Sequence, residues 1–346
     1  MKKFLLIWCL VCSVAAYAQE NKKMYETSFP SKEVKELVVV NSSGNVSLKQ
    51  TEEAFCRVVA AIVVEAKSEE KVQEALAMTR IDTAVTDGSR TFTTVLDKEM
   101  GLKKAFAGVK VQVDYQLAVP RGVRVRIVNS NGDVSVPAFA GRMDVDVNNG
   151  NITAGVLQDG ECYIKQSGGD CNIERVNVLD GEFRNGNVLI GDGENIRLNL
   201  NACTGDIASA GKLNVRSSGG KMKIGDVERL IGSSSFTKYE VQDLADLLDM
   251  DMKMGEMNIR NIRPLFSEIR LKTSFTKVGL TFMDKASYAL EIKHNKSLKM
   301  DLPEGLELEY APTSERNVRI GKAQVGDAAQ AGKVQLEISN GNFYLQ

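Results

Sequence analysis

The stretch that decides the fold is residues 125–152, VRIVNSNGDVSVPAFAGRMDVDVNNGNI, in which one short pattern occurs twice. A Gly is followed by an acidic or amide residue and then by an apolar residue, at Gly132-Asp133-Val134 and again at Gly150-Asn151-Ile152. The pattern returns about every 18 residues as far as Gly205-Asp206-Ile207. A repeat of this length is typical of a solenoid, in which each copy is a rung that is stable only against its neighbours.

Apolar residues occupy fixed positions around each Gly. In the first regular copy they are Val125 and Ile127, which precede the Gly by seven and five residues, and Val134 and Val136, which follow it by two and four. A spacing of two is the period of a β-strand with one buried face. Charged residues hold the alternate positions, as in RGVRVR at 121–126. We therefore expect two short strands in each coil, with these four positions pointing inward.

The same template fits near both ends of the chain, at residues 37–48 and 334–345, and in two later copies Thr237 and Thr276 replace the Gly. The sequence therefore predicts an all-β fold. We expect a parallel β-solenoid with coils of about 18 residues and two strands each. A strand-rich N-terminal section containing one helix is expected to cap it, because an open strand edge needs protection.

Four segments follow from these patterns. We expect a signal peptide at residues 1–18, a first rung and capping section at 19–120, the regular β-solenoid at 121–286, and irregular coils with a last rung at 287–346. Within the cap, residues 68–78 (SEEKVQEALAM) predict a helix with Ser68 as its N-cap. Residues 81–96 and 109–119 predict strands that pair with each other, and residues 311–333 predict an extended loop or hairpin.

The segment 1–18 has the features of a secretory signal peptide. Lys2 and Lys3 precede an apolar stretch, and Ala16-Tyr17-Ala18 is a small-residue cleavage motif. The apolar stretch is too short to span a bilayer, and we expect no transmembrane segment in the mature chain. The protein is therefore expected to be exported, to the periplasm, the cell surface or the medium.

The composition excludes some functions. The chain has 346 residues, of which 43% are apolar, and a formal net charge of −1. It has no basic patch or interleaving of Arg with aromatic residues, so we expect no nucleic-acid partner. His294 is the only histidine, which excludes a His-rich metal site; we expect it at the surface or in a turn.

Several motifs resemble a known family. They are Leu117-Ala118-Val119-Pro120-Arg121-Gly122, Asn129-Ser130-Asn131-Gly132-Asp133-Val134 and Asn41-Ser42-Ser43-Gly44-Asn45-Val46. This pattern, over roughly residues 33–286, resembles the bacterial envelope β-solenoid family called "putative adhesin", a domain of unknown function. It is also similar to the head domain of putative autotransporter adhesins. The resemblance implies a fold and an envelope location, and it brings no catalytic residues.

The residues that follow the Gly form the candidate ligand site. A stack of carboxylate and amide oxygens could bind Ca²⁺ or sugar hydroxyls, although Asp and Asn also stabilise tight turns through their own backbone. We favour the turn interpretation, and the ligand interpretation stays open. The members of this column are Asp133, Asn151, Asp170, Asn187 and Asp206.

Two further features have a chemical and a structural interpretation. Asp82-Thr83-Ala84 is similar to an acceptor for bacterial O-glycosylation at Thr83, and the same polar stretch fits a turn. Cys162 and Cys171 occupy inward positions, so we interpret them as small buried hydrophobes. A bridge between them, and the pairing of Cys56 and Cys203, stay open.

No group of residues predicts a reaction or a cofactor. We expect no catalytic, cofactor-binding or metal site, and interpret the chain as an exported, non-catalytic β-solenoid, an adhesin or binding scaffold of the envelope. Its partner is expected to be a glycan or an envelope or extracellular protein. The first alternative is a periplasmic structural or envelope-stress accessory protein, and the second is a carbohydrate-active enzyme on a β-helix.

Overall fold

The computed structural model describes residues 21–97 and 108–346. The predicted signal peptide, residues 1–18, lies outside the described residues. The described chain is nearly all β, with parallel and antiparallel strand pairs and a single α-helix, α2 (Glu69–Met78). Within these residues no helix combines the length and the apolar character needed to cross a membrane. The chain divides into two compact units, residues 1–153 and 154–346.

The first unit contains two ladders of hydrogen-bonded strands. Each ladder joins parallel pairs to antiparallel pairs. In spatial order the first ladder is β5 (Thr79–Thr86), β6 (Ser89–Leu96), β2 (Glu36–Asn41), β8 (Arg124–Asn129) and β10 (Met143–Asn148). The second is β1 (Lys22–Pro30), β4 (Phe55–Glu65), β7 (Lys110–Pro120), β3 (Val46–Thr51) and β9 (Val134–Ala140).

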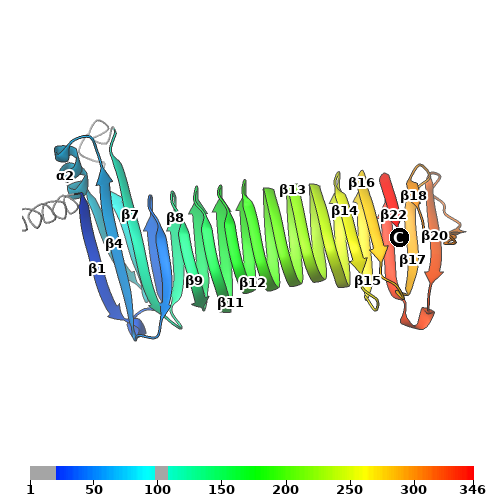
Figure 1. Cartoon of the computed structure of the whole chain (residues 1–346), viewed down its shortest axis with the longest axis horizontal. Helices are drawn as coiled ribbons and strands as arrows, with labels where there is room; N and C mark the ends of the chain where they lie inside the picture. The colour runs from blue at the N-terminus through cyan, green and yellow to red at the C-terminus, as the bar shows by residue number, and fades with distance from the viewer. Residues whose placement is uncertain (1–20, 98–107) are drawn as a thin grey trace, which may run out of the picture. The chain divides into compact units, whose positions relative to one another are not determined.

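The predicted first rung lies directly beside the rung that begins at residue 125. Leu37 pairs in register with Val125, and Val46 pairs with Val134. These are the same template positions, so residues far apart in the chain occupy neighbouring layers. The chain between them is an insertion, which adds the strands β4 to β7 to the outer side of the first rung (Figure 1).

The insertion differs from the sequence prediction in one respect. The strands predicted at 81–96 and 109–119 do not pair with each other. Residues 79–96 form their own hairpin, β5 with β6, around Asp87 and Gly88, whose φ angles are 52° and 82°. Two positive φ angles in a two-residue loop suit the right-handed twist of a hairpin, and β7 pairs instead with β4 and β3.

An aromatic cluster forms part of the core of this unit. Phe92 of β6 is fully buried, and its ring lies 6.1 Å from the ring of Phe29 and 6.2 Å from that of Tyr25, both in β1. Aromatic pairs at this separation stabilise beyond their buried area. The helix α2 begins after Ser68, whose Oγ accepts the N–H of Lys71, as predicted.

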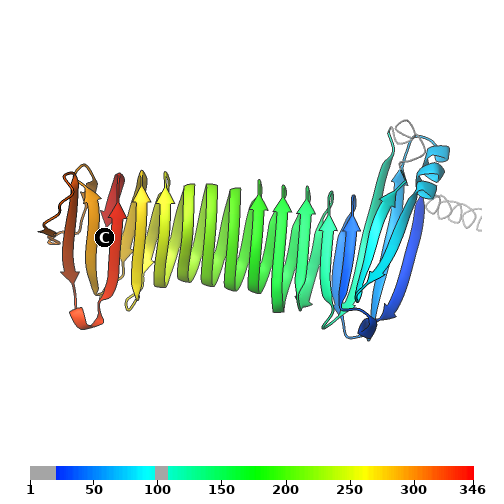
Figure 2. The ribbon, with the colours of Figure 1, turned by 180° about the vertical axis from the view of Figure 1, so that it is seen from behind.

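Long parallel strands wind through the second unit. Figure 1 shows β12 (Cys171–Arg184), β13 (Asn187–Lys253), β14 (Glu256–Ile262) and β16 (Thr276–Phe282) side by side, in green to yellow, and Figure 2 shows them from behind. β11 (Ile152–Ser167) precedes them and begins in the first unit. Cys171 pairs with Val188, Tyr239 with Met257, and Met257 with Val278. In each pair the partner holds the same template position in the next copy of the repeat.

The inward positions of the template are buried. In the nine regular copies, every residue seven or five positions before the Gly or Thr, and two or four after it, is buried except Ser209 and Gly232. The prediction of one packed face and one polar face is confirmed for these columns.

The C-terminal segment does not follow chain order. Val334 pairs with Ile269, and on its other side Leu290 pairs with Val334. The last rung is thus inserted between the rung that begins near residue 269 and the strand that begins at residue 288, although it follows both in the chain. The strands concerned are β15 (Glu268–Ser274), β21 (Gly332–Ile338), β17 (Tyr288–Asn295), β22 (Gly341–Leu345) and β18 (Lys299–Asp301).

Antiparallel strands complete this unit. β20 (Val318–Val325) pairs antiparallel with β17 and with β19 (Glu309–Ala311). The wholly parallel arrangement that the repeat predicts is therefore corrected to a mixed one. The segment predicted as a loop or hairpin, 311–333, contains β20, and the repeat carries no signal for a reversed strand.

Candidate functional site

The predicted column of Asp and Asn residues forms a hydrogen-bonded ladder along the turns of the first unit. Asp114 Oδ1 accepts the backbone N–H of Asn45 (2.7 Å), and Asn45 Oδ1 accepts that of Asp133 (2.9 Å). Asp133 Oδ1 in turn accepts the N–H of Asn151 (2.8 Å). Each side chain thus caps the next turn, which favours the turn interpretation.

The same contact recurs in the second unit. Asp170 Oδ1 accepts the backbone N–H of Asn187 (3.2 Å) and its side-chain Nδ2–H (2.8 Å). The side chain of Asp206 has no hydrogen bond to another described residue. In the described ranges, no three His, Cys, Asp or Glu side chains gather in a way that could hold a metal ion. Ligand binding by this column stays a prediction.

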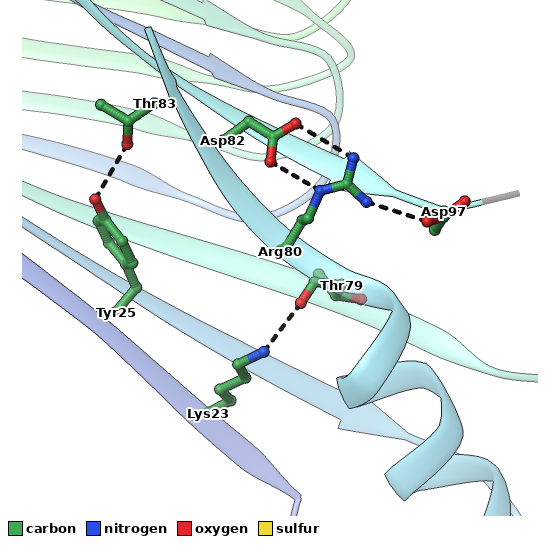
Figure 3. A network of polar contacts seen from close by, with 7 residues as sticks. All are labelled: Lys23, Tyr25, Thr79, Arg80, Asp82, Thr83 and Asp97. Carbon is green, nitrogen blue, oxygen red and sulfur yellow. Dashed lines mark hydrogen bonds and ion pairs between the residues drawn. The ribbon is translucent and has the colours of Figure 1, made fainter.

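Thr83 lies exposed on β5, whose only strand partner among the described residues is β6. Its hydroxyl is 3.1 Å from the hydroxyl of Tyr25, and Figure 3 shows the two side chains pointing toward each other within a network of polar contacts. Lys23 donates to the carbonyl of Thr79 (3.4 Å) in the same network. An enzyme that modifies an extended segment has access to Thr83 from solvent. Glycosylation there stays a prediction.

The neighbouring Asp82 is held by Arg80. Arg80 Nε donates to Asp82 Oδ1 (2.8 Å) and its Nη1 to Asp97 Oδ2 (3.1 Å), as Figure 3 shows. The hydrogen bond to Asp82, with the charge of that carboxylate, raises the pKa of Arg80. This pairing fixes the side chain of the residue next to Thr83, although both partners are about half exposed and contribute little to stability.

The expectation that His294 lies at the surface or in a turn is wrong. Its side chain is 3% exposed, because it continues the inward column of β17, where it pairs in register with Ile338. Nδ1 lies 2.8 Å from the carbonyl oxygen of Asn295, and the ring centroid lies 6.0 Å from that of Tyr310. Nε2 is buried and has no hydrogen-bond partner among the described residues.

The four cysteines outside the signal peptide are buried. Burial raises the pKa of the Cys56 thiol to about 11. It raises the pKa of Cys171 further, and the nearby Cys162 adds to this effect. Thiols with raised pKa values react slowly, which agrees with the interpretation of small buried hydrophobes; the pairing stays open.

A ladder of alternating charges covers one outer face of the second unit. Lys221 and Lys238 both contact Glu240 (3.1 and 3.3 Å), and Lys238 and Lys277 both contact Glu256 (3.2 and 3.3 Å). The hydrogen bond from Lys221 lowers the pKa of Glu240. Burial works to raise the pKa of Glu256, but the two lysines outweigh it and the pKa falls. Both carboxylates are therefore held ionised.

A hollow of about 330 Å³ lies beside this ladder, and we call it the Tyr344 hollow. Along one row of paired strands stand Asn258, Gly279 and Tyr344, from β14, β16 and β22. Because Gly279 has no side chain, it forms the floor between the amide and the ring. The other residues that line the hollow are Glu256, Met257, Lys277, Leu280, Thr281 and Gln346.

A second hollow of the same unit has a different character. It measures about 700 Å³ and is lined by β17, β20, β21 and the segment around Leu306. Glu291 and Lys322 form an ion pair across it (2.9 Å), and Glu307 and Glu309 add acidic groups. We call it the Leu306 hollow.

Sequence reasoning missed the residues of the Tyr344 hollow. Tyr344 alternates with the inward Phe343 and Leu345, so its outward position could be found from the template. Its contact with Gly279 could not, because that requires knowing that the last rung stacks on residues 269–280 out of chain order.

No family model matches the sequence, and no curated protein matches it. Among solved structures, the chain is similar to a putative cell adhesion protein from Clostridium sporogenes, with 10% identity, 94% of this chain and 100% of that chain covered, and a TM-score of 0.22. It is similar to a putative adhesin from Bacteroides fragilis, with 14% identity, 75% and 97% covered, and a TM-score of 0.29. It is also similar to a putative lipid binding protein from Parabacteroides distasonis, with 13% identity, 76% and 96% covered, and a TM-score of 0.34.

Two of these three names agree with the "putative adhesin" resemblance that the sequence motifs carry. Because each TM-score lies below 0.5, no function is transferred from them to this chain.

Proposed function

We propose that the chain is an exported, non-catalytic binding protein of the cell envelope, built as a β-solenoid with two strands in each coil, in which successive copies of the repeat pair in parallel and antiparallel strands are added at both ends of the chain. The observation that carries the proposal is the outer face of β13, β14, β16 and β22, where ion-paired charges surround the Tyr344 hollow. The in-register pairing of equivalent template positions in successive copies of the repeat supports the solenoid. The repeat interval gives its coils a length of about 18 residues.

The charge state of this face does not suit Glu240 or Glu256 to act as a general acid. A general acid needs a carboxyl group with a raised pKa, as in glycosidases. At Glu240 and Glu256 the lysines lower the pKa, which suits a fixed polar surface. A long face of this kind fits an extended partner such as a glycan or an extracellular protein.

Export and location can be tested together. Intact cells are treated with a protease and the chain is detected with an antibody. Digestion places the protein at the surface, and protection that ends when the outer envelope is opened places it in the periplasm. Recovery of an uncleaved chain in the cytosol would contradict export.

Binding and catalysis need a separate test. The purified protein is applied to arrays of glycans and of extracellular-matrix and envelope proteins, and is incubated with polysaccharides while new reducing ends are measured. We expect saturable binding without turnover. Turnover that disappears in a single Glu-to-Gln variant would show an enzyme, and the absence of any binding would overturn the proposed function.

A further inference from the structure

The Tyr344 hollow has the chemistry of a site for one ring of a neutral sugar. We propose that it binds a pyranose of a glycan, an inference that rests on the proposed binding function and names its ligand class. The volume of about 330 Å³ is at the lower end of the range for small-molecule sites, about 300–1,000 Å³, which fits one ring rather than a larger ligand.

Space for the ligand comes from Gly279. Its φ lies outside the left-handed region, so the backbone does not demand a glycine. A Cβ added there would lie 2.8 Å from Asn258 Oδ1, on the side of the hollow opposite Tyr344. The missing side chain therefore separates an amide from an aromatic ring and leaves room between them.

The polar groups of the hollow have hydrogen-bonding capacity to spare. The side chains of Asn258, Thr281 and Tyr344 are half-buried, and none of them makes a hydrogen bond with another described residue. An amide offers two donors and an acceptor, and each hydroxyl offers a donor and acceptor sites. Such uncharged groups match the hydroxyls of a sugar.

The charges of the hollow are balanced before any ligand arrives. Glu256 contacts Lys238 and Lys277, and Lys277 Nζ lies 5.6 Å from the centroid of the Tyr344 ring. A charged ligand would have to break these pairs, whereas a neutral one would not. The aromatic ring gives the apolar C–H face of a sugar a surface to pack against.

A peptide strand is the main rival occupant. Strand addition needs an edge with unpaired backbone groups. β16 is paired on both sides, with β14 and β22, and β22 is paired with β16 and β18. The hollow thus lies on the face of the sheet, where side chains rather than backbone groups meet a ligand.

The test uses the purified protein on an array of neutral, sialylated and sulfated glycans, followed by titration calorimetry with the best neutral glycan. Gly279→Val fills the floor, Tyr344→Ala removes the ring, and Asn258→Ala removes the amide. We expect Gly279→Val and Tyr344→Ala to abolish measurable binding, and Asn258→Ala to weaken it about tenfold. Asn261→Ala, in the same strand but outside the hollow, is the matched control and should bind as the unmodified protein does.

Thermal unfolding separates binding from folding, because all four changed side chains lie outside the buried core. Loss of binding with an unchanged unfolding midpoint supports the proposal. Neutral-glycan binding that survives Gly279→Val and Tyr344→Ala, or binding only to anionic glycans, overturns the hollow as the site while the proposed function stands. Binding only to proteins would also overturn the hollow as a sugar site and leave the proposed binding function standing. Binding to neither glycans nor proteins would overturn both proposals.

Discussion

The parallel strands β12–β16 of the second unit and the antiparallel strands β1, β4 and β7 of the first both bury a hydrophobic face. They differ in how the buried residues are arranged along the sequence. In the parallel region, each inward residue packs against the residue one coil away, so columns in the sequence are columns in space. In the antiparallel region, partners run in opposite directions and no column repeats. The difference teaches that periodicity in the sequence reports the core of the parallel region, whereas buried pairs of the antiparallel region, such as Val58 and Leu117, belong to no repeat.

The largest effect is expected from a charge placed in a repeated column. Ile173 in β12 is fully buried, and Ile173→Asp should lower the free energy of unfolding by about 4 kcal/mol or more, because an unpaired carboxylate is buried there. Urea unfolding followed by circular dichroism measures this. The control Asn172→Asp adds the same group at the adjacent exposed position and should cost less than about 0.5 kcal/mol. Equal costs would refute the assignment of the inward column.

In the first unit, the next effect is expected at the aromatic cluster that joins β6 to β1. Phe92→Ala removes a fully buried ring that contacts Phe29 and Tyr25, and should cost about 3–5 kcal/mol in the same measurement. Phe55 is the control because it is 50% exposed, and Phe55→Ala should cost less than about 1 kcal/mol. A small effect of Phe92→Ala would mean that the aromatic cluster contributes little and that the buried aliphatic residues of β4 and β7 stabilise this core instead.

A neighbouring pair of glycines tests how closely the coils approach. Gly219 and Gly220 both have positive φ angles, 74° and 105°. The Cβ of an alanine at Gly219 would lie 4.0 Å from its nearest neighbour, Ala202 Cα, without a clash, so the variant should cost about 1–2 kcal/mol for its backbone conformation alone. The methyl group of Gly220→Ala would collide with the carbonyl of Cys203, one coil away, and should cost about 1–3 kcal/mol more. Identical unfolding midpoints for the two variants would contradict this spacing of the coils.

The sequence predicts the parallel region well because its signal is redundant. The Gly pattern, the inward columns and the intervals between copies all indicate the same register, and the observed pairs follow it. The N-cap of α2 was also predictable, since Ser68 acts through its own local backbone.

The rest depends on contacts that a local pattern does not carry. The hairpin at Asp87-Gly88 has a recognisable turn signal, but the pairing of β7 with β4 joins segments with no shared motif. At the other end, insertion of residues 334–345 beside residues 269–280 determines the Tyr344 hollow. His294 was misjudged for the same reason, because its burial depends on that stacking.

The charge ladder should make a smaller contribution to the stability of the fold, and this contribution should depend on pH. Because the folded protein lowers the pKa of Glu256 from its ordinary value of 4.5, the ladder stabilises the fold above that value and the contribution is lost as the pH falls through the folded-state pKa. Glu256→Gln should therefore reduce stability by up to about 1 kcal/mol at neutral pH. The difference from the unmodified protein should shrink below pH 4.5 and in high salt.

Thermal unfolding at several pH values measures this difference. Glu174 is the control, because it is exposed and makes no ion pair with the described residues. Glu174→Gln should show no such pH dependence. A Glu256→Gln effect that is constant from acid to neutral pH would mean that packing rather than charge is involved.

The smallest effect on stability is expected at Thr83. Thr83→Ala removes one exposed hydrogen bond, to Tyr25, and should cost less than about 0.5 kcal/mol. The effect of Thr83→Ala on glycosylation should be larger than its effect on stability. Mass spectrometry of the protein from its natural host should find a glycan on the peptide that contains Thr83, and none on that peptide in the Thr83→Ala variant.

Thr86, which lies on the same exposed strand outside the Asp82-Thr83-Ala84 motif, provides the matched comparison. If Thr86 carried the glycan and Thr83 did not, exposure on the strand edge would govern modification rather than the motif. An unmodified Thr83 in the exported protein would refute the prediction. Thr83 lies opposite Phe92 in the pairing of β5 with β6, and its hydroxyl contacts Tyr25, whose ring packs on Phe92. Modification of Thr83 would therefore replace this exposed hydrogen bond at the edge of the aromatic cluster.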